Sequence, residues 1–458
     1  MIIDESDPNG HGPAWKHSNR IYAILQYNFI VFPCTLLLTF YGLKRLVDYT
    51  GYYADVTDEV WTRSATVHAA STAFFFFMQF PPYANTLGLC LPMQPLKHTK
   101  GPKKRRLGTL RICLVTKGTN VQTAINSARC WDSLSQRHHP AIRFHVLVDN
   151  NNGAEFRSQL PSYIIVDQVP KNVPSQRALY KARALEHFRQ KYKLSKEDWV
   201  LHLDEESEID ERVLDASLDF IERGTADIGN GTIYYTSVNH WTNTFLSATE
   251  IVRLAEDYGR FQLPFKTLKR PFLGWIHGSW LLINGEVENR IGWDTDNMCE
   301  DYWFGYHAAQ HGFKFEWVHA LFREQPPVSL MDFWRQRRRW YTGIWSMDRI
   351  TVRLALIAAG LSGLAALMVP VIGILGIRIV APSWYWYWML FNDATTIHIL
   401  AVASVLQDLS MTDVSIINIV GHAIVSIILS PFAHVLQAVA LVSSLLVPST
   451  GYCVIEKA

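Results

Sequence analysis

The sequence predicts an α/β domain between two groups of membrane-spanning helices, and three observations lead to this prediction. Uncharged apolar runs gather at the two ends of the 458-residue chain. Between them, short β-branched runs alternate with helix-like segments, which is typical of a mainly parallel sheet covered on both faces. Two of the strand-like runs end in aspartate. We expect an N-terminal membrane region over 1–106, an α/β domain over 107–350 and a C-terminal membrane region over 351–458.

The N-terminal part contains two candidate membrane spans. The first runs from Ile21 to Leu43 without a charged residue and is long enough to cross a hydrocarbon core of about 30 Å as a helix. The second uncharged run extends from Ala65 to Leu96 and is interrupted by Pro81 and Pro82. It is too long and too far from the N-terminus to be a signal peptide, so we interpret it as a second span.

The C-terminal part contains three further apolar runs, at Leu354–Ile377, Trp384–Gln407 and Ile416–Val447. The aromatic cluster SWYWYWM at 383–389 is typical of a membrane–water boundary. The last run contains Pro431, so it predicts either one kinked span or two shorter pieces. We expect five spans in the whole chain, with four or six as alternatives.

Basic residues next to the spans predict the orientation of the chain. The segment KHTKGPKKRR, at 97–106, holds six Lys or Arg directly after the second candidate span. Such clusters stay on the cytoplasmic side, so we expect the region 107–350 in the cytosol. The endoplasmic reticulum, the Golgi and the plasma membrane all remain possible locations for this multi-pass protein.

Net charge and cysteine content exclude some other classes of protein. The formal net charge is only +2, so nothing predicts nucleic acid as a partner. The six cysteines are scattered and form no CxxC pair or metal-ligand spacing. We therefore expect reduced, buried thiols rather than disulfides.

The middle of the chain alternates between strand-like and helix-like segments. Strands are expected at 110–117, 142–149 and 198–204, and helices at 121–136 and 174–192. In open α/β sheets the ligand binds at the carboxyl ends of the strands. Asp149 and Asp204 each end a strand, so we expect both carboxylates at a ligand site.

A cluster of acids follows the third predicted strand, in the stretch VLHLDEESEID at 200–210. Asp204 and Glu206 are two residues apart, so their side chains share one face of an extended segment. Such a pair can hold a divalent cation and leave positions for substrate phosphates and water. The alternative is a solvated acidic turn before a helix at Asp210, but the position at a strand end beside Asp149 favours the cation site.

A second acid pair, Glu300 and Asp301, follows the turn-like sequence GWDTDN. Acids at this place could cap the N-terminus of a helix. They could also supply a general base, because a hydroxyl group is a poor nucleophile unless a carboxylate within hydrogen-bond reach accepts its proton. The residues alone leave these two interpretations equal.

The stretch MDFWRQRRRWYTGIW predicts an amphipathic helix. Helical spacing places Gln336, Arg339 and Trp340 on one face. The plainest interpretation is a helix at the membrane interface, with Arg337 and Arg338 facing the lipid headgroups. Arg339 could in addition neutralise a departing diphosphate, and Trp340 could offer a flat apolar surface to a sugar ring.

Three motifs occur in the order DEE (204–206), CED (299–301) and QRRRW (336–340). This combination resembles the membrane-bound family-2 glycosyltransferases, the group that includes cellulose, chitin and hyaluronan synthases. YKARAL (180–185) resembles the Lys/Arg-containing helix near the donor nucleotide of such enzymes.

Two departures separate the chain from the synthases. A cysteine precedes ED where many synthases have threonine, and DEE replaces DxD. Both point to the Egghead-like β-1,4-mannosyltransferases. This closer resemblance covers residues 198–350 and is carried by WVLHLDEES, GNGTIYY, GWIHGSWLLI, CEDYWFG and DFWRQRRRWYTGIW.

The resemblance implies a GT-A fold and an inverting, metal-dependent hexosyltransferase. The expected reaction transfers one mannose from GDP-mannose to a glycolipid such as glucosylceramide and forms a β-1,4 linkage. The expected cofactor is Mn²⁺ or Mg²⁺, and the expected partners are a nucleotide-sugar donor, a lipid-linked sugar acceptor and membrane lipids. Alternatives are a processive β-glycan synthase that uses a UDP- or GDP-sugar and, less favoured, a transporter or a non-catalytic membrane scaffold.

The family pattern also implies roles for residues of this chain. Asp149, Lys181 and Asp204 would bind the donor nucleotide and its diphosphate, and Asp204 would hold the cation together with Glu206. Asp301 would be the general base, with Glu300 beside it. The residues expected on the acceptor and diphosphate side are Gln336, Arg339 and Trp340.

Overall fold

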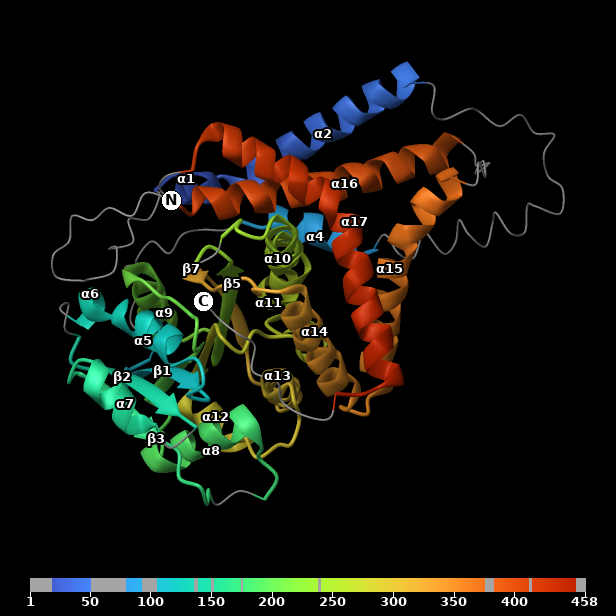
Figure 1. Ribbon diagram of the computed structural model, residues 1–458. Helices are drawn as coiled ribbons and strands as arrows, with labels where there is room; N and C mark the ends of the chain where they lie inside the picture. The colour runs from blue at the N-terminus through green and yellow to red at the C-terminus, as the bar shows by residue number, and fades with distance from the viewer. Residues whose placement is uncertain are drawn as a thin grey trace.

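A computed structural model describes most of the chain. The described residues are 19–50, 80–92, 105–135, 139–149, 152–173, 176–237, 240–374, 383–411 and 414–449. They form an α/β domain and a group of long apolar helices that lie along one side of it (Figure 1). The second expected span, Ala65–Leu96, falls mostly outside the described residues.

The α/β domain is built on a seven-stranded sheet with the order β3-β2-β1-β4-β6-β5-β7. β6 runs antiparallel to both of its neighbours, and the other neighbouring strands are parallel. The strands are β1 Leu110–Thr116, β2 Ile142–Val148, β3 Ile164–Gln168, β4 Trp199–Asp204, β5 Ile228–Tyr234, β6 Leu281–Asn284 and β7 Phe315–Arg323. This mostly parallel sheet confirms the expected fold class, and the three predicted strands are β1, β2 and β4.

Helices cover both faces of the sheet. Side chains alternate along a strand, so Ile112 and Leu114 of β1 belong to one apolar core, whereas Cys113 and Val115 belong to the other. The first core is covered by α5 Val121–Arg129, α6 Asp132–Ser135, α7 Gly153–Gln159 and α9 Glu211–Arg223. The second core is covered by α8 Tyr180–Tyr192, α12 Gly285–Ile291 and α13 Glu300–Gln310.

Six apolar helices accompany this domain. They are α1 Asn19–Gln26, α2 Asn28–Thr50, α4 Phe80–Cys90, α15 Ile350–Ile374, α16 Ser383–Leu409 and α17 Ile416–Leu446. Within the described ranges, three helices are long and apolar enough to cross a membrane: Asn28–Tyr49, Trp386–Leu409 and Ile416–Leu446. The second and third of them match the fourth and fifth expected spans, and α15 covers most of the third expected span. The first expected span, Ile21–Leu43, is instead divided between α1 and α2, so the apolar helix here begins at Asn28.

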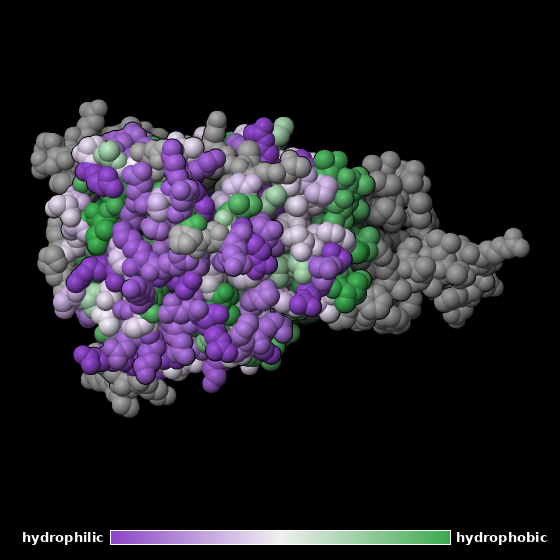
Figure 2. All heavy atoms as spheres, turned by 90° about the horizontal axis from the view of Figure 1, so that it is seen from below, coloured by the Kyte–Doolittle hydropathy of each residue, from purple (hydrophilic) through white to green (hydrophobic). Residues whose placement is uncertain are grey.

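The last apolar run is one helix, α17, with Pro431 inside it. Figure 1 shows α17 bending part-way along its length, as expected where proline removes a backbone hydrogen bond. Figure 2 shows mainly hydrophilic residues on the lower face of the α/β domain and hydrophobic residues on the side where α15 and α17 lie. Exposed Leu354 and Ile357 on α15 and Phe432 on α17 are among the large apolar side chains of these helices.

A third group of helices joins the sheet to the apolar helices. It comprises α10 Thr244–Glu256, a π-helical turn at Asp257–Phe261, α11 Gln262–Leu268 and α14 Leu330–Trp345. Ile251 and Leu254 of α10 share one buried apolar cluster with Ile399, Ala403 and Leu406 of α16. A third buried cluster, distinct from the two cores of the sheet, therefore joins β5, β7 and α10 to the apolar helices.

Three expectations about helices are wrong. The helix predicted over 121–136 is divided into two, α5 and α6. The helix predicted over 174–192 begins only at Tyr180, because the backbone N–H groups of 176–178 donate to the Asp294 carboxylate. Arg337 does not face lipid headgroups. Its side chain is 1% exposed and forms an ion pair of 2.8 Å with Glu250 of α10, which fixes α14 against that helix.

The cysteines agree with the sequence only in part. Each of the five that the structure describes is free of disulfides. Cys113 and Cys299 are buried as expected, whereas Cys34 is exposed on α2.

Candidate active site

Motifs far apart in the sequence meet at the carboxyl end of β4. Lys181, in the first turn of α8, forms an ion pair with Asp204, the last residue of β4. The Lys181 ammonium also lies 3.5 Å from Oε1 of Glu300, the first residue of α13. Lys181 thus connects the DEE motif to the CED motif.

Asp149 lies one residue beyond β2, at the same edge of the sheet. Its backbone N–H donates to the carbonyl of Thr116 over 2.9 Å, and its carboxylate forms an ion pair with Arg183 of α8. Burial raises the pKa of Asp149, and the Arg183 guanidinium opposes this effect. α8 therefore presents two basic side chains, Lys181 and Arg183, to the two strand-end aspartates. The sequence did not single out Arg183, although it lies within YKARAL.

Two acids of the crowded 204–210 stretch are used to hold the domain together. Glu205 accepts hydrogen bonds from the hydroxyl of Thr116, the last residue of β1, at 2.6 Å and from the amide of Asn120, in the loop after β1, at 2.5 Å. Glu208 accepts a hydrogen bond of 2.7 Å from the Ser237 hydroxyl, beyond the end of β5. These bonds offset the cost of burying both carboxylates.

Asp210 begins a helix. Its carboxylate accepts the N–H of Val213 at 2.9 Å and so caps the N-terminus of α9. The helix-start interpretation is therefore right for Asp210, whereas the cation site at Asp204 and Glu206 stays a prediction. Asp210 begins a helix, whereas Asp204 and Glu206 lie where the strand ends.

Glu300 and Asp301 occupy the first turn of α13, where the helix dipole favours acids. Glu300 is 5% exposed, and this burial raises its pKa to about 7, against the lowering effect of the Lys181 charge. Asp301 is more exposed and packs against Gly278. A Cβ added at Gly278 would come within 2.8 Å of Asp301 Oδ2, so glycine is needed to leave room for this carboxylate.

α14 brings Arg339 to the same place. Nη1 of Arg339 donates to the carbonyl of Met298 over 3.4 Å, just before the CED motif. The Arg339 charge also lowers the pKa of Glu300, which shows that it lies within electrostatic reach of the acid pair. The sequence placed Arg339 near a leaving diphosphate, and the structure puts it next to the CED segment.

Trp340 and Gln336 are held by neighbouring guanidinium groups. The ring of Trp340 lies 4.8 Å from the guanidinium carbon of Arg253 and 4.2 Å from that of Arg337. Gln336 accepts a hydrogen bond of 2.7 Å from Arg337. Arg337 is therefore the residue that orients this face of α14, which the sequence did not indicate.

We did not identify two other charged residues of this region from the sequence. Arg253 on α10 stacks on Trp340, and Glu324 directly follows β7. Burial raises the pKa of Glu324 to about 7, and the negative charges of Glu206 and Asp204 add to this effect. The signal for Glu324 was present, because it follows an apolar strand in the same way as Asp204.

The donor set at the end of β4 fits a divalent cation that is shared with a substrate. Asp204 and Glu206 offer carboxylate oxygens, which Mg²⁺ and Mn²⁺ prefer. Nowhere in the described part of the chain do three His, Cys, Asp or Glu side chains form a ready metal site. A cation bound by Asp204 and Glu206 would keep several positions for phosphate oxygens and water.

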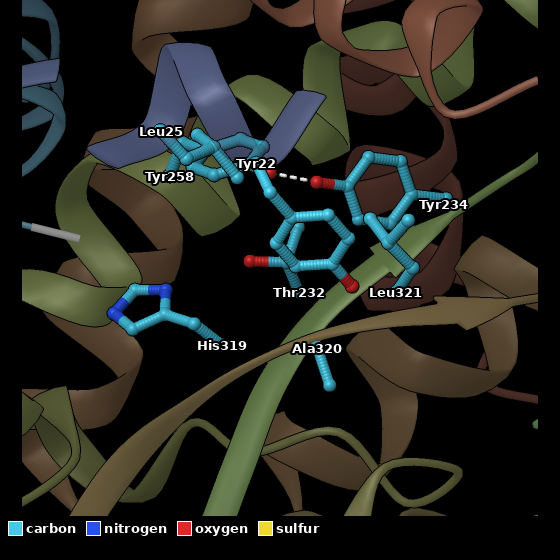
Figure 3. A pocket seen from close by; sticks show the side chains of 8 residues that line it. All are labelled: Tyr22, Leu25, Thr232, Tyr234, Tyr258, His319, Ala320 and Leu321. Atoms are coloured by element: carbon cyan, nitrogen blue, oxygen red, sulfur yellow. Dashed lines mark hydrogen bonds between the residues drawn. The ribbon is translucent and has the colours of Figure 1, made fainter. Parts of the chain in front are cut away.

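Two cavities differ greatly in what they could hold. One of about 360 Å³ lies between the segment before Glu300 and the C-terminal half of α14, and Met298, Trp303 and Gly343 are among its lining residues. That volume is typical of small-molecule sites. The other, of about 10 Å³, lies between α1 and the strands β5 and β7 (Figure 3). It holds about one water, so it is not a substrate site.

Comparison with known proteins agrees with this geometry. The family described as "Glycosyl transferase family group 2" matches residues 199–406, a range that includes all three motifs. "Beta-1,4-mannosyltransferase bre-3" of Caenorhabditis elegans is 32% identical over 174 residues, and "Beta-1,4-mannosyltransferase egh" of Drosophila melanogaster is 30% identical over 184 residues. The alignments cover 36% and 38% of this chain, and only 37% and 39% of the relatives' own length.

Among solved structures, "Mannosyltransferase PcManGT from Pyrobaculum calidifontis in complex with GDP-Man and Mn2+" aligns with 83% of this chain and 97% of that chain, at 11% identity and a TM-score of 0.44. The expected resemblance is confirmed by the family match and by the two curated relatives. Through the segment that carries DEE, CED and QRRRW, the chain is similar to the Egghead-like β-1,4-mannosyltransferases of glycosyltransferase family 2.

Proposed function

We propose that this protein is an inverting membrane glycosyltransferase that transfers one mannose from GDP-mannose to a glycolipid such as glucosylceramide, in β-1,4 linkage and on the cytosolic side. The observation that carries the proposal is the meeting of Lys181, Asp204 and Glu300 at one strand end, because these residues come from three separate motifs. The named relatives supply the choice of mannose, and the long apolar helices support a lipid acceptor.

The donor diphosphate would lie over the end of β4. Lys181 would exchange its pairing with Asp204 for a phosphate oxygen, as an ammonium group commonly does. Asp204 and Glu206 would hold Mn²⁺ or Mg²⁺, which when bound neutralises charge on the leaving diphosphate. Asp149 would contact the ribose or base, and Arg183 fixes its carboxylate for that contact.

The acceptor would approach from the side of α14. Asp301 would accept the proton of the acceptor hydroxyl while the hydroxyl oxygen bonds to the anomeric carbon and the bond to the diphosphate oxygen breaks. A single displacement of this kind converts an α-linked donor into a β-linked product. Arg339 would add positive charge near the leaving group, and Trp340 would offer its ring to a sugar.

α14 is followed within a few residues by α15, whose first turns are apolar and exposed. A lipid held beside α15 could therefore present its headgroup to the site while its chains stay in the membrane. We expect this arrangement to favour a single transfer to a lipid over export of a polymer.

The test is transfer of radiolabelled mannose from GDP-mannose to glucosylceramide by detergent-purified protein with Mn²⁺. Asp301→Asn should lower kcat about 10²- to 10⁴-fold, as expected for the loss of a general base. The matched control is Glu316→Gln on β7, whose carboxylate pairs with Arg223 and Thr225 away from the site. Chelation should abolish activity, and added Mn²⁺ should restore it.

A lipid product carrying one mannose, lost with Asp301→Asn and retained with Glu316→Gln, supports the proposal. Long chains made from UDP-sugars would contradict it and identify a polysaccharide synthase instead.

A further inference from the structure

Glu324 is held at the edge of the site by its backbone. Its N–H donates to the carbonyl of Tyr234 at the end of β5 over 2.9 Å, and its carbonyl accepts the N–H of Ser237 over 3.2 Å. Only 7% of the residue is exposed. The pairing of β5 with β7 therefore fixes where this carboxylate lies, and the side chain has little freedom to turn toward solvent.

One oxygen of this buried carboxylate has no partner within the protein. The Ser279 hydroxyl bonds to the carboxylate, but no donor among the described residues reaches Oε1 of Glu324. Burying a carboxylate oxygen without a hydrogen bond is unfavourable, because the oxygen leaves water and gains no donor in exchange. Such an atom at a binding site indicates that a ligand supplies the missing donor.

The charged neighbours of Glu324 place it beside the proposed cation pair. Arg323, which precedes Glu324, exchanges backbone hydrogen bonds of 2.9 and 3.1 Å with Glu208 of the acidic stretch. The charges of Glu206, Asp204 and Arg253 all act on the Glu324 carboxylate. The guanidinium carbon of Arg253 lies 4.7 Å from the ring of Tyr235 and 4.8 Å from that of Trp340. Glu324 and Arg253 therefore connect the proposed cation ligands, Asp204 and Glu206, to the QRRRW helix α14.

The residues that contact Glu324 and its neighbours extend toward the proposed general base, Asp301, and toward the apolar helices. Ser279, which bonds to Glu324, follows Gly278, against which Asp301 packs. On the other side, the N–H of Tyr235 donates to Gln407 of α16 over 3.2 Å. A sugar that entered from the apolar helices and reached Asp301 would pass beside Tyr235, Glu324 and Ser279.

We propose that Glu324 binds the acceptor sugar, with Oε1 accepting hydrogen bonds from ring hydroxyls next to the one that is mannosylated. This inference rests on the proposed function and names the group that recognises its acceptor. A buried carboxylate next to an aromatic ring is well suited to a hexose, because charged acceptors form the stronger hydrogen bonds with hydroxyls. A third cation ligand is the less favoured role, since no three acids of the described residues converge as a metal site.

The experiment compares the full-length wild type with Glu324→Gln, which keeps the shape and removes the charge. Loss of a charge-assisted hydrogen bond should raise the KM for glucosylceramide about 10- to 100-fold. The KM for GDP-mannose, the Mn²⁺ concentration for half-maximal activity and the slow hydrolysis of GDP-mannose without acceptor should stay within twofold. Glu316→Gln, on the same strand, should change none of these quantities.

Three further measurements keep the inference open to contradiction. Binding of Mn²⁺ and GDP, measured by calorimetry, should be equal in wild type and Glu324→Gln, which also shows that the variant folds. Ser279→Ala, which removes the hydroxyl that steadies the carboxylate but keeps its charge, should raise the acceptor KM only a few-fold. Binding of a soluble β-glucoside, followed by NMR, should weaken in Glu324→Gln in proportion to the acceptor KM.

An unchanged acceptor KM and unchanged glucoside binding in Glu324→Gln would overturn the inference. So would a weaker affinity for Mn²⁺ and GDP with the acceptor KM unaltered, because Glu324 would then serve the cation. If the wild type transfers nothing from GDP-mannose, the proposed function fails, and the glucoside measurement alone decides whether Glu324 binds a sugar.

Discussion

The four carboxylates of the 204–208 stretch have different roles, and these roles depend on their hydrogen-bond partners rather than on their spacing. Glu205 and Glu208 are satisfied by side chains of the surrounding loops, whereas Asp204 pairs with a lysine that could release it to a substrate. The ion pair of Asp204 with Lys181 also brings in Glu300. A single lysine thus offsets much of the repulsion that so many neighbouring acids would create.

These different roles predict that substitution of Glu205 lowers stability, whereas substitution of the adjacent Glu206 lowers activity. Glu205→Gln places an amide donor against donors from Thr116 and Asn120 and should destabilise the fold by about 1 to 3 kcal/mol. Glu206→Gln should leave Tm nearly unchanged but lower kcat by about 10²-fold, because the proposed cation loses one ligand. Thermal melts and mannose-transfer assays on both variants check this. Equal effects on Tm would show that the two acids are not divided in this way.

Lys266 on α11 gives a pH-dependent prediction away from the site. Burial, and then the charge of Lys269, lower its pKa from 10.5 to about 7, although Nζ donates to the carbonyl of Pro92 at 2.8 Å. The unfolded chain therefore binds more protons between pH 7 and pH 10.5, so Lys266 makes stability rise with pH across this window. Its destabilising effect is complete below pH 7.

Lys266→Met should accordingly raise Tm most at pH 6 to 7, and the gain should shrink toward pH 10. Melting curves across this range measure it, and Lys196→Met, at an exposed position before β4, is the control. A gain that stays constant with pH would mean that the pKa of Lys266 is the same in the folded and the unfolded chain.

At the level of elements, the loop before α8 is tied to the segment before α13. Oδ1 of Asp294 accepts backbone N–H groups of Gln176, Arg177 and Ala178 at 3.1, 2.8 and 2.9 Å. Although burial acts in the opposite direction, these donors hold the pKa of Asp294 below its ordinary value. Lys181 lies just beyond this loop, so Asp294 links the donor-side helix to the acid pair of α13.

Asp294→Ala should raise the KM for GDP-mannose about 5- to 10-fold, because the start of α8 and therefore Lys181 would lose its support. Asp294→Asn keeps an acceptor oxygen and should remain within about threefold of the wild type. Steady-state kinetics with varied donor decide this, and Asp296→Ala, an exposed acid two residues away, should have no effect. If Asn and Ala variants lose donor affinity equally, the charge of Asp294 matters rather than its hydrogen bonds.

The elements show which parts of the fold a sequence can predict. β1, β2 and β4 were predictable because each is a short apolar run, and the strand-end position of Asp149 and Asp204 follows directly. The start of α8 could not be predicted in this way. The helical pattern of the sequence continues through 174–179, and the Asp294 carboxylate that binds this segment lies more than a hundred residues later in the chain. Arg337 was misassigned for the same reason, since its partner Glu250 lies on another helix.

The site shows the same limit. DEE, CED and QRRRW were each visible, but only the fold shows that Lys181 joins the first two and that Glu324 stands beside them. Glu324 follows β7 directly, at the end of a strand like Asp204 of β4, but the sequence does not show that these two strand ends lie close together.

For the whole molecule, Asp408 of α16 is the main polar connection between the apolar helices and the α/β domain. It is fully buried, and Oδ1 accepts hydrogen bonds of 3.1 Å from both His240 and Trp241, in the segment between β5 and α10. Oδ2 bonds to His422 of α17 over 2.8 Å. One side chain therefore joins two apolar helices to a loop that extends from the sheet.

Asp408→Ala should lower Tm by several degrees, because three buried ring nitrogens lose their acceptor at once. Asp348→Ala removes an exposed carboxylate from a surface pair with Arg353 and should change Tm little. Melting in detergent compares them, and equal losses would show that the Asp408 network does not stabilise the junction.

The apolar cluster shared by α10 and α16 has a practical consequence for anyone who wishes to crystallise or engineer the α/β domain by itself. A chain cut after Arg349 would leave Ile251, Leu254 and Tyr258 facing water where Ile399, Ala403 and Leu406 now cover them. Expression of that fragment should yield aggregates, and grafting a polar surface onto α10 would be the first repair to attempt. Swapping apolar helices between relatives should fail for the same reason unless α10 is exchanged with them.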